Sequence, residues 1–216
     1  MNFAITLAGH RSVRTSFAWP ARGLWSAHVE LDEEVTLALG SSATLAIGEK
    51  LSLAGTIVRG GPFAGTSTYL VRAGHGGWNK TLPRRAYRSD GGVKASTVLT
   101  DAAREAGEAW AGALPTTPIG PAFARMKAPA IRVVNLLLGG AWYVDDDGRT
   151  QPQARPESTF IGEVLNVESA SRMAKLASDT PENVRPRCTV PGVGRVSLVT
   201  IEAEHSRIAM RARGEV

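Results

Sequence analysis

The chain has 216 residues, of which 43% are hydrophobic and 21% are charged, and its formal net charge is +5. These proportions are typical of globular proteins, and no segment approaches the roughly 18 unbroken apolar residues that a membrane-spanning helix needs. We therefore expect one or two small domains without membrane insertion, since a compact domain usually has about 100–200 residues. The opening residues lack the basic and apolar regions of a secretory signal, which predicts synthesis and residence in the cytoplasm.

The cysteine and histidine pattern gives no support for a metal or a cofactor. Cys188 is the only cysteine, so an internal disulfide and a cysteine-rich zinc site are excluded. The histidines are scattered and form no pair at the i, i+4 spacing of helical metal sites. We expect neither metal nor cofactor. The four histidines are His10, His28, His75 and His205.

Residues 1–75 predict an N-terminal β-barrel-like domain. Short runs of alternating apolar and polar residues are separated by Gly, Pro and Asp, which is typical of antiparallel strands with one buried face. In residues 24–31 the apolar side chains Trp25, Ala27, Val29 and Leu31 fall on one face. Five or six strands at this spacing favour a small barrel or sandwich.

Residues 76–158 predict a mixed α/β segment. Apolar residues recur at helical spacing over 93–110 and again over 128–138, which indicates two amphipathic helices. The residues between them, 111–121, contain three prolines and read as a linker. Residues 141–155 predict a β-hairpin, because an Asp-Gly turn lies between two candidate strands. The three consecutive aspartates there do not have the spacing of a calcium loop, so a turn is favoured.

Residues 159–216 predict a C-terminal β-rich domain, with alternation clearest over 195–205 and a short polar helix-like piece over 169–178. The expected fold class is therefore α+β and mostly β. It consists of two small antiparallel β-barrel or sandwich domains with an inserted helical or mixed segment.

The stretch "VRAGHGGWNKTLPRRAYRSDGG", residues 71–92, resembles two kinds of catalytic loop without matching either. His-Gly-Gly occurs in the oxyanion loops of esterases, but the chain has no Gly-x-Ser-x-Gly nucleophile elbow. A phosphate-binding loop needs glycine where Asn79 stands. We therefore interpret the glycines as turn residues and predict no catalytic residue, with His75 a surface or seam residue.

Four residues of this stretch are candidate seam or interface residues. Trp78 has a large apolar body and one N–H donor, which suits it to fill the seam between a β-domain and the following helix. Arg84, Arg85 and Arg88 form the densest basic group of the chain. Arginines elsewhere are interleaved with acids, so a solvated face or an acidic protein partner is favoured over a nucleic-acid site.

Five motifs in order along the chain resemble the tail-hub and baseplate proteins of tailed bacteriophages and prophages, the family with tail-tube-like barrels. They are a Gly-x-Trp strand at 23–25, a Gly-Thr-Ile-Val-Arg-Gly-Gly hairpin at 55–61, a Gly-Gly-Trp seam at 76–78, a helix from Val-Leu-Thr-Asp-Ala-Ala to Gly-Glu at 98–108, and Trp-Tyr-Val-Asp-Asp-Asp-Gly at 142–148. The resemblance implies a structural, non-enzymatic protein of the virion tail tip. It implies a ring, a trimer in the hubs, that joins the tail tube to a spike or fibre complex, with DNA only passing through.

Alternatives to a tail hub stay open at this point. The chain is short for the larger hubs, so a distal-tail ring protein with one barrel is one alternative. A tail-associated hydrolase of the cell envelope is another, although the acidic cluster in residues 30–34 has no apolar pocket implied around it. A receptor- or carbohydrate-binding module is the third, with the five tryptophans as stacking platforms, but their spacing favours core packing.

Overall fold

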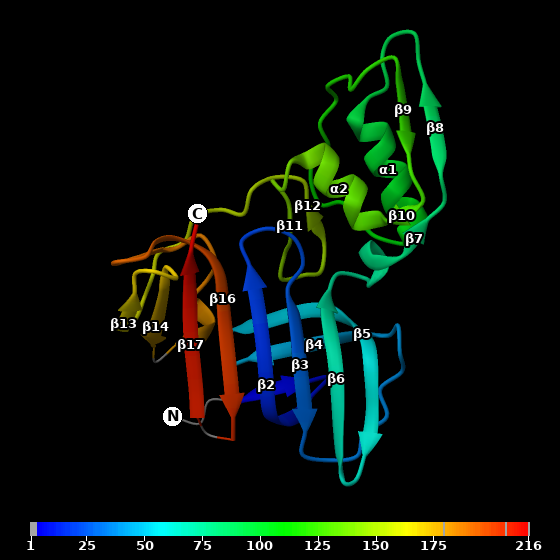
Figure 1. Cartoon of the computed structure of the whole chain (residues 1–216). Helices are drawn as coiled ribbons and strands as arrows, with labels where there is room; N and C mark the ends of the chain where they lie inside the picture. The colour runs from blue at the N-terminus through cyan, green and yellow to red at the C-terminus, as the bar shows by residue number, and fades with distance from the viewer. Residues whose placement is uncertain (1–3, 179, 206, 216) are drawn as a thin grey trace.

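The structure is a computed structural model that describes residues 4–178, 180–205 and 207–215. It is mostly β with two α-helices, which confirms the predicted fold class. Figure 1 shows a lower body built from strands of both ends of the chain, and an upper lobe built from its middle. We call residues 76–158 the inserted lobe.

A six-stranded antiparallel barrel forms the first part of the body. The strands follow the order β1-β4-β5-β6-β3-β2, and β1 also pairs with β2, which closes the barrel. Alternation puts Ala27, Val29 and Leu31 inside, as predicted. The strands are β1 (Ile5–Leu7), β2 (His10–Pro20), β3 (Ser26–Leu31), β4 (Ser42–Ile47), β5 (Leu51–Phe63) and β6 (Thr66–Ala73).

The C-terminal strands continue the wall of this barrel. The second half of β2 pairs with β16 from Arg14↔Glu204 to Pro20↔Leu198, and the sheet goes on in the order β16-β17-β14-β13. The two β-rich parts therefore share one sheet, and no pairing among the described residues closes the C-terminal strands into a ring of their own. They are β13 (Glu163–Glu168), β14 (Met173–Ala177), β15 (Thr189–Val190), β16 (Gly194–Glu204) and β17 (Arg207–Gly214), with a 3-10 turn η2 (Pro181–Asn183).

The helix-like interpretation of residues 169–178 was wrong, because these residues form a turn and the strand β14. Ala174 and Leu176 alternate with exposed Lys175 and are buried, and β14 pairs with β17 on one side and β13 on the other. Pairing on both sides decides the conformation here, since the helix propensity of Ala, Lys and Leu is only a weak preference.

The inserted lobe contains both helices and several short strands. Helix α1 (Ala95–Ala106) lies inside the predicted range 93–110 and ends at Gly107, whose φ of 84° is left-handed. Helix α2 (Ala130–Leu138) lies inside the predicted range 128–138. Among the described residues, neither helix has the length and apolarity to cross a membrane. The other elements are η1 (Gly77–Asn79), β7 (Thr81–Leu82), β8 (Arg85–Arg88), β9 (Ala122–Arg125), β10 (Ala128–Pro129), β11 (Tyr143–Val144) and β12 (Thr150–Gln151).

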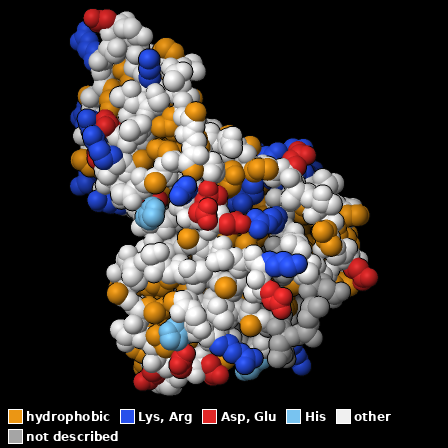
Figure 2. Space-filling view, turned by 180° about the vertical axis from the view of Figure 1, so that it is seen from behind, with side chains coloured by type: hydrophobic (Ala, Val, Ile, Leu, Met, Phe, Trp, Pro, Cys, Tyr) orange, Lys and Arg blue, Asp and Glu red, His pale blue; other side chains and the backbone are white. Residues whose placement is uncertain are grey.

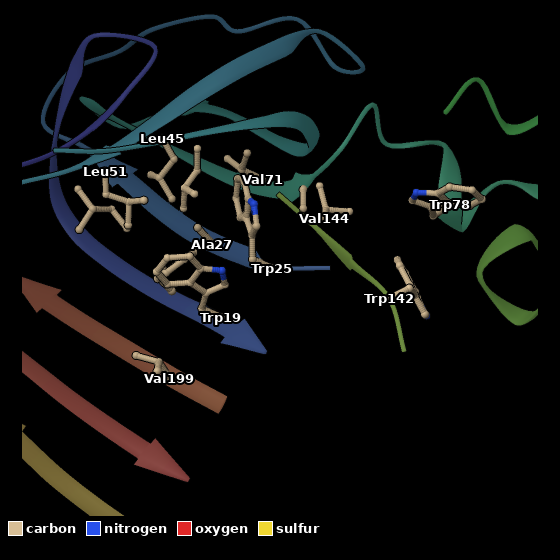
Figure 3. Packing of buried hydrophobic residues seen from close by; sticks show 14 of the residues in the cluster. Trp19, Trp25, Ala27, Leu45, Leu51, Val71, Trp78, Trp142, Val144 and Val199 are labelled. Carbon is tan, nitrogen blue, oxygen red and sulfur yellow. The ribbon is translucent and has the colours of Figure 1, made fainter. Parts of the chain in front are cut away.

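One apolar core runs from the barrel into the inserted lobe. Trp19 and Trp25 are fully buried in the body, and Trp78 and Trp142 are fully buried in the lobe. Figure 3 shows Val144 lying between the two groups. The hairpin of β11 and β12 therefore joins them, and the backbone N–H of Ala54 in β5 donates a hydrogen bond to the carbonyl of Asp146 in its turn.

Candidate functional site

The seam is the loop of residues 74–80, where β6 leaves the barrel and enters the inserted lobe. Gly74 and Gly76 both have φ of 80°, a left-handed conformation that glycine adopts at little steric cost. The hydroxyl of Thr56 in β5 donates a hydrogen bond of 2.8 Å to the carbonyl of Gly74. The loop is therefore fixed to the barrel at its first residue.

The backbone N–H groups of this loop surround the carboxylate of Glu108. Gly77 donates to Oε1 at 2.6 Å, Trp78 donates to the same oxygen at 3.2 Å, and His75 donates to Oε2 at 3.2 Å. A concavity of successive N–H groups is a general anion-binding geometry. Here the anion belongs to the chain itself, so these three donors are not free to hold a phosphate or an oxyanion.

Close approach explains why glycine stands at two of these positions. A Cβ on Gly74 would lie 2.9 Å from Oε2 of Glu108, and a Cβ on Gly77 would lie 2.2 Å from the carbonyl oxygen of Ala106. The second distance is a backbone clash that no side-chain rotation relieves. The glycines that resemble a catalytic loop therefore make room for the end of α1.

Burial is the largest influence on Glu108, which is 8% exposed, and it raises the pKa of the carboxyl group. The N–H donors of His75, Gly77 and Trp78 act in the opposite direction, because they stabilise the ionised form. Glu108 follows Gly107, and its own N–H donates to the carbonyl of Ala103. The left-handed glycine at the end of α1 thus turns the carboxylate toward the loop.

Trp78 is fully buried at the centre of the seam. Its ring centroid lies 5.2 Å from that of Trp110 and 6.2 Å from that of Trp142, both in tilted orientations. Its indole N–H donates a 2.8 Å hydrogen bond to the hydroxyl of buried Thr150. The side chain therefore contacts residues from the middle and from the C-terminal part of the inserted lobe, and Figure 3 shows it beside Trp142.

The three predicted arginines, of which Arg85 and Arg88 lie in β8 and Arg84 directly precedes it, have different surroundings. Arg85 pairs with Asp101 at 3.0 Å and with Glu105 at 2.9 Å, so it holds β8 against α1. Arg84 and Arg88 are exposed and form no ion pair with any residue that the structure describes. Figure 2 shows Lys and Arg side chains along the outer edge of the inserted lobe. Of the predicted group, only Arg84 and Arg88 are therefore available to a partner.

Two arginines that are buried in the structure were not identified in the sequence analysis. Arg125 in β9 is 4% exposed, pairs with Glu105 and donates to the carbonyl of Pro83. Arg155 stacks its guanidinium 4.2 Å from the Tyr143 ring, and burial lowers its pKa to about 10. Neither stands in a motif, and each acquires its role from residues distant in the sequence.

The remaining residues that the sequence analysis considered are His75 and the three consecutive aspartates of residues 145–147. The His75 side chain is exposed, and only its backbone N–H takes part in the seam. Asp145 accepts the N–H of Arg149 and Asp146 pairs with Arg185 at 2.8 Å, so these carboxylates serve the hairpin turn and its contact with the body. Within the part of the chain that the structure describes, no group of three His, Cys, Asp or Glu side chains gathers as metal ligands.

Comparisons with known proteins reveal similarity in fold. No family model matches the chain, and no curated protein matches its sequence. The 43 kDa tail protein of prophage MuSo2 from Shewanella oneidensis has a TM-score of 0.66 at 10% identity, over 99% of this chain and 98% of that one. The E. coli protein c3393 has a TM-score of 0.66 at 11% identity, over 98% of this chain and 77% of that one.

The protein c3393 is described as a component of the type VI secretion system with structural similarity to the T4 tail proteins gp27 and gp5. A tail protein from Neisseria meningitidis MC58 has a TM-score of 0.59 at 10% identity, over 98% of this chain and 96% of that one. Each of the three alignments covers at least 98% of this chain. The chain therefore has the fold of these tail proteins, barrel and inserted lobe together.

Proposed function

We propose that this chain is a structural component of a bacteriophage tail tip, a baseplate hub protein that joins the tail tube to the central spike or fibre complex. It acts by assembly into a ring, a trimer, with no catalytic step, and DNA only passes through the ring. Its partners are further copies of itself and the tube, distal-tail and spike or fibre proteins. It resides in the virion after synthesis in the host cytoplasm.

The observation that carries this proposal is the fold shared along the whole chain with two proteins named as tail proteins and with a type VI secretion component. A ring subunit needs a rigid frame, and the closed barrel, its continuous extension and the seam supply one. The loop that most resembles catalytic machinery is filled by Glu108, which favours assembly over the hydrolase alternative.

The test is to locate the protein in assembled particles. A tagged copy expressed from its own phage or prophage should co-purify with tails, and gold-labelled antibody should mark the tail tip in electron micrographs. Deletion of the gene should stop tail assembly at the tip. Absence of the protein from purified tails would contradict the proposal, and release of peptidoglycan fragments by the purified protein would favour a hydrolase.

A further inference from the structure

An apolar groove of about 530 Å³ runs along the inserted lobe between β9 and α2. Its walls include Phe123 and Met126 on the strand side, and Val133 and Leu136 on the helix side. Met126 is 64% exposed and Leu136 is 69% exposed, although both are large apolar side chains. An exposed apolar patch of this kind is typical of a binding surface.

The groove has an open strand on one side and a basic rim. Among the described residues β9 pairs only with β8, so one edge of β9 has no hydrogen-bonded neighbour. Residues 122–138, which build both walls, contain no acidic residue. Arg125 is buried and paired with Glu105, so Lys127 and Arg132 supply the basic charge of the rim. An extended segment can add a strand to such an edge while alternate side chains enter the groove. The apolar lining and the basic rim of the groove therefore favour, as a binding partner, an extended segment that has both apolar and acidic side chains.

The opposite side of the molecule carries a segment with these properties. Strand β13 is the last strand of the large sheet and pairs only with β14 among the described residues. Residues 160–168 contain two acidic side chains and no basic one. Ile161, Glu163 and Leu165 occupy alternate positions and are all exposed, with 56% exposure for both apolar residues. Glu163 and Leu165 belong to β13, and Ile161 lies two residues before the strand begins, so exposed apolar and acidic side chains follow one another along this edge.

We propose that residues 161–168 of one copy dock in the groove between β9 and α2 of a second copy and add a strand to β9. Ile161 and Leu165 enter the apolar groove, and Glu163 faces the basic rim that Arg132 contributes. The inference rests on the proposed function, because it supplies the contact by which a ring would form. Since the two surfaces are different, the interface is head-to-tail and each copy presents one surface of each kind, as a ring requires.

The test uses two variants whose changed side chains are already exposed, so that folding is preserved. Leu136→Asp puts a charge in the groove, and Leu165→Asp removes an apolar side chain from the strand. Each variant alone should weaken self-association about tenfold or more in analytical ultracentrifugation, since buried apolar anchors dominate such contacts. Mixed together, the two variants should form a one-to-one heterodimer, because each retains the surface that the other lacks.

Phe63→Asp is the matched control, because Phe63 is 83% exposed at the end of β5 and belongs to neither surface. It should associate as the unchanged protein does. The inference is overturned if either single variant associates normally, if the mixture stays monomeric, or if the unchanged protein is a monomer up to its solubility limit. None of these results affects recovery of the protein in purified tails, which tests the proposed function separately.

Discussion

The barrel and the inserted lobe are stabilised in different ways. The barrel closes on itself through strand pairing around fully buried apolar residues such as Phe17 and Leu45. The lobe has short elements, and charged groups tie them together: Glu108 in the loop, and Glu105 between two arginines. Burial of apolar surface depends little on pH, whereas each of these contacts depends on the ionisation of a carboxyl group. The lobe should therefore be the part that responds to point changes and to pH.

The largest expected effect is that of Trp78→Ala. The change leaves a cavity among Trp110, Trp142 and Thr150, and should lower the free energy of unfolding by about 3–5 kcal/mol. Chemical denaturation measures the loss, and hydrogen exchange should show it concentrated in α1, α2 and β12. His75→Ala is the control, with an expected change within about 0.5 kcal/mol because the side chain is exposed. Equal loss of protection in the barrel would contradict the division into two differently stabilised regions.

The next largest effect is that of Glu108→Ala. Without the carboxylate, the N–H groups of His75, Gly77 and Trp78 lose their acceptor, which should destabilise the protein by about 1–3 kcal/mol. Glu108→Gln should be milder, because its amide oxygen still accepts. Burial raises the pKa of Glu108, so its contribution is fully present below the ordinary glutamate pKa and declines as pH rises through the folded-state pKa. A stability profile of Glu108→Gln without this decline would support the assignment.

Glu105 should show the opposite dependence on pH at a smaller magnitude. Burial acts to raise its pKa, but hydrogen bonds and charge from Arg125 and Arg85 outweigh it and lower the pKa. Its stabilisation is therefore present above the ordinary glutamate pKa and is lost as pH falls through the folded-state pKa. Glu105→Gln should remove that acid-sensitive part, which is under about 1 kcal/mol for a partly exposed pair. An unchanged acid unfolding curve would show that the ion pairs contribute nothing.

The smallest expected effect is that of replacing Arg84 and Arg88 with alanine. Both side chains are exposed, so the double variant should change the free energy of unfolding by less than about 0.5 kcal/mol. Incorporation into tails is the informative measurement. Normal stability with reduced incorporation would mark these arginines as contact residues, and normal incorporation would make them part of a solvated face.

The barrel was predictable from the sequence because its pattern is local. The alternation of Ala27, Val29 and Leu31 follows directly from the two-residue repeat of a strand, and the apolar spacing over 93–110 follows from that of a helix. The pairing of β1 with β4, the pairing of β3 with β6 and the continuation of β2 into β16 could not be read in this way, since they join residues that are far apart in the sequence.

The seam was only half predictable. The loop could be recognised by its glycines, and Trp78 by its size. The third component of the seam is Glu108, which lies 31 residues beyond Gly77 in the sequence. The signal that could have identified Glu108 is its place directly after a helix-ending glycine, where a side chain is turned back toward preceding structure. Strand β8 was hidden for a different reason, because its arginines give it no apolar alternation and only pairing with β9 defines it.

The occupied loop also has a consequence for how the joint between barrel and lobe forms. A loop that waits for a free anion is filled according to the amount of that anion in the cell, and other anions compete for it. The Glu108 carboxylate is tethered to the loop by the chain, which places it there at an effective concentration on the order of millimolar or above. The joint between barrel and lobe is therefore complete as soon as the chain folds, and a free anion is not needed to fill this loop.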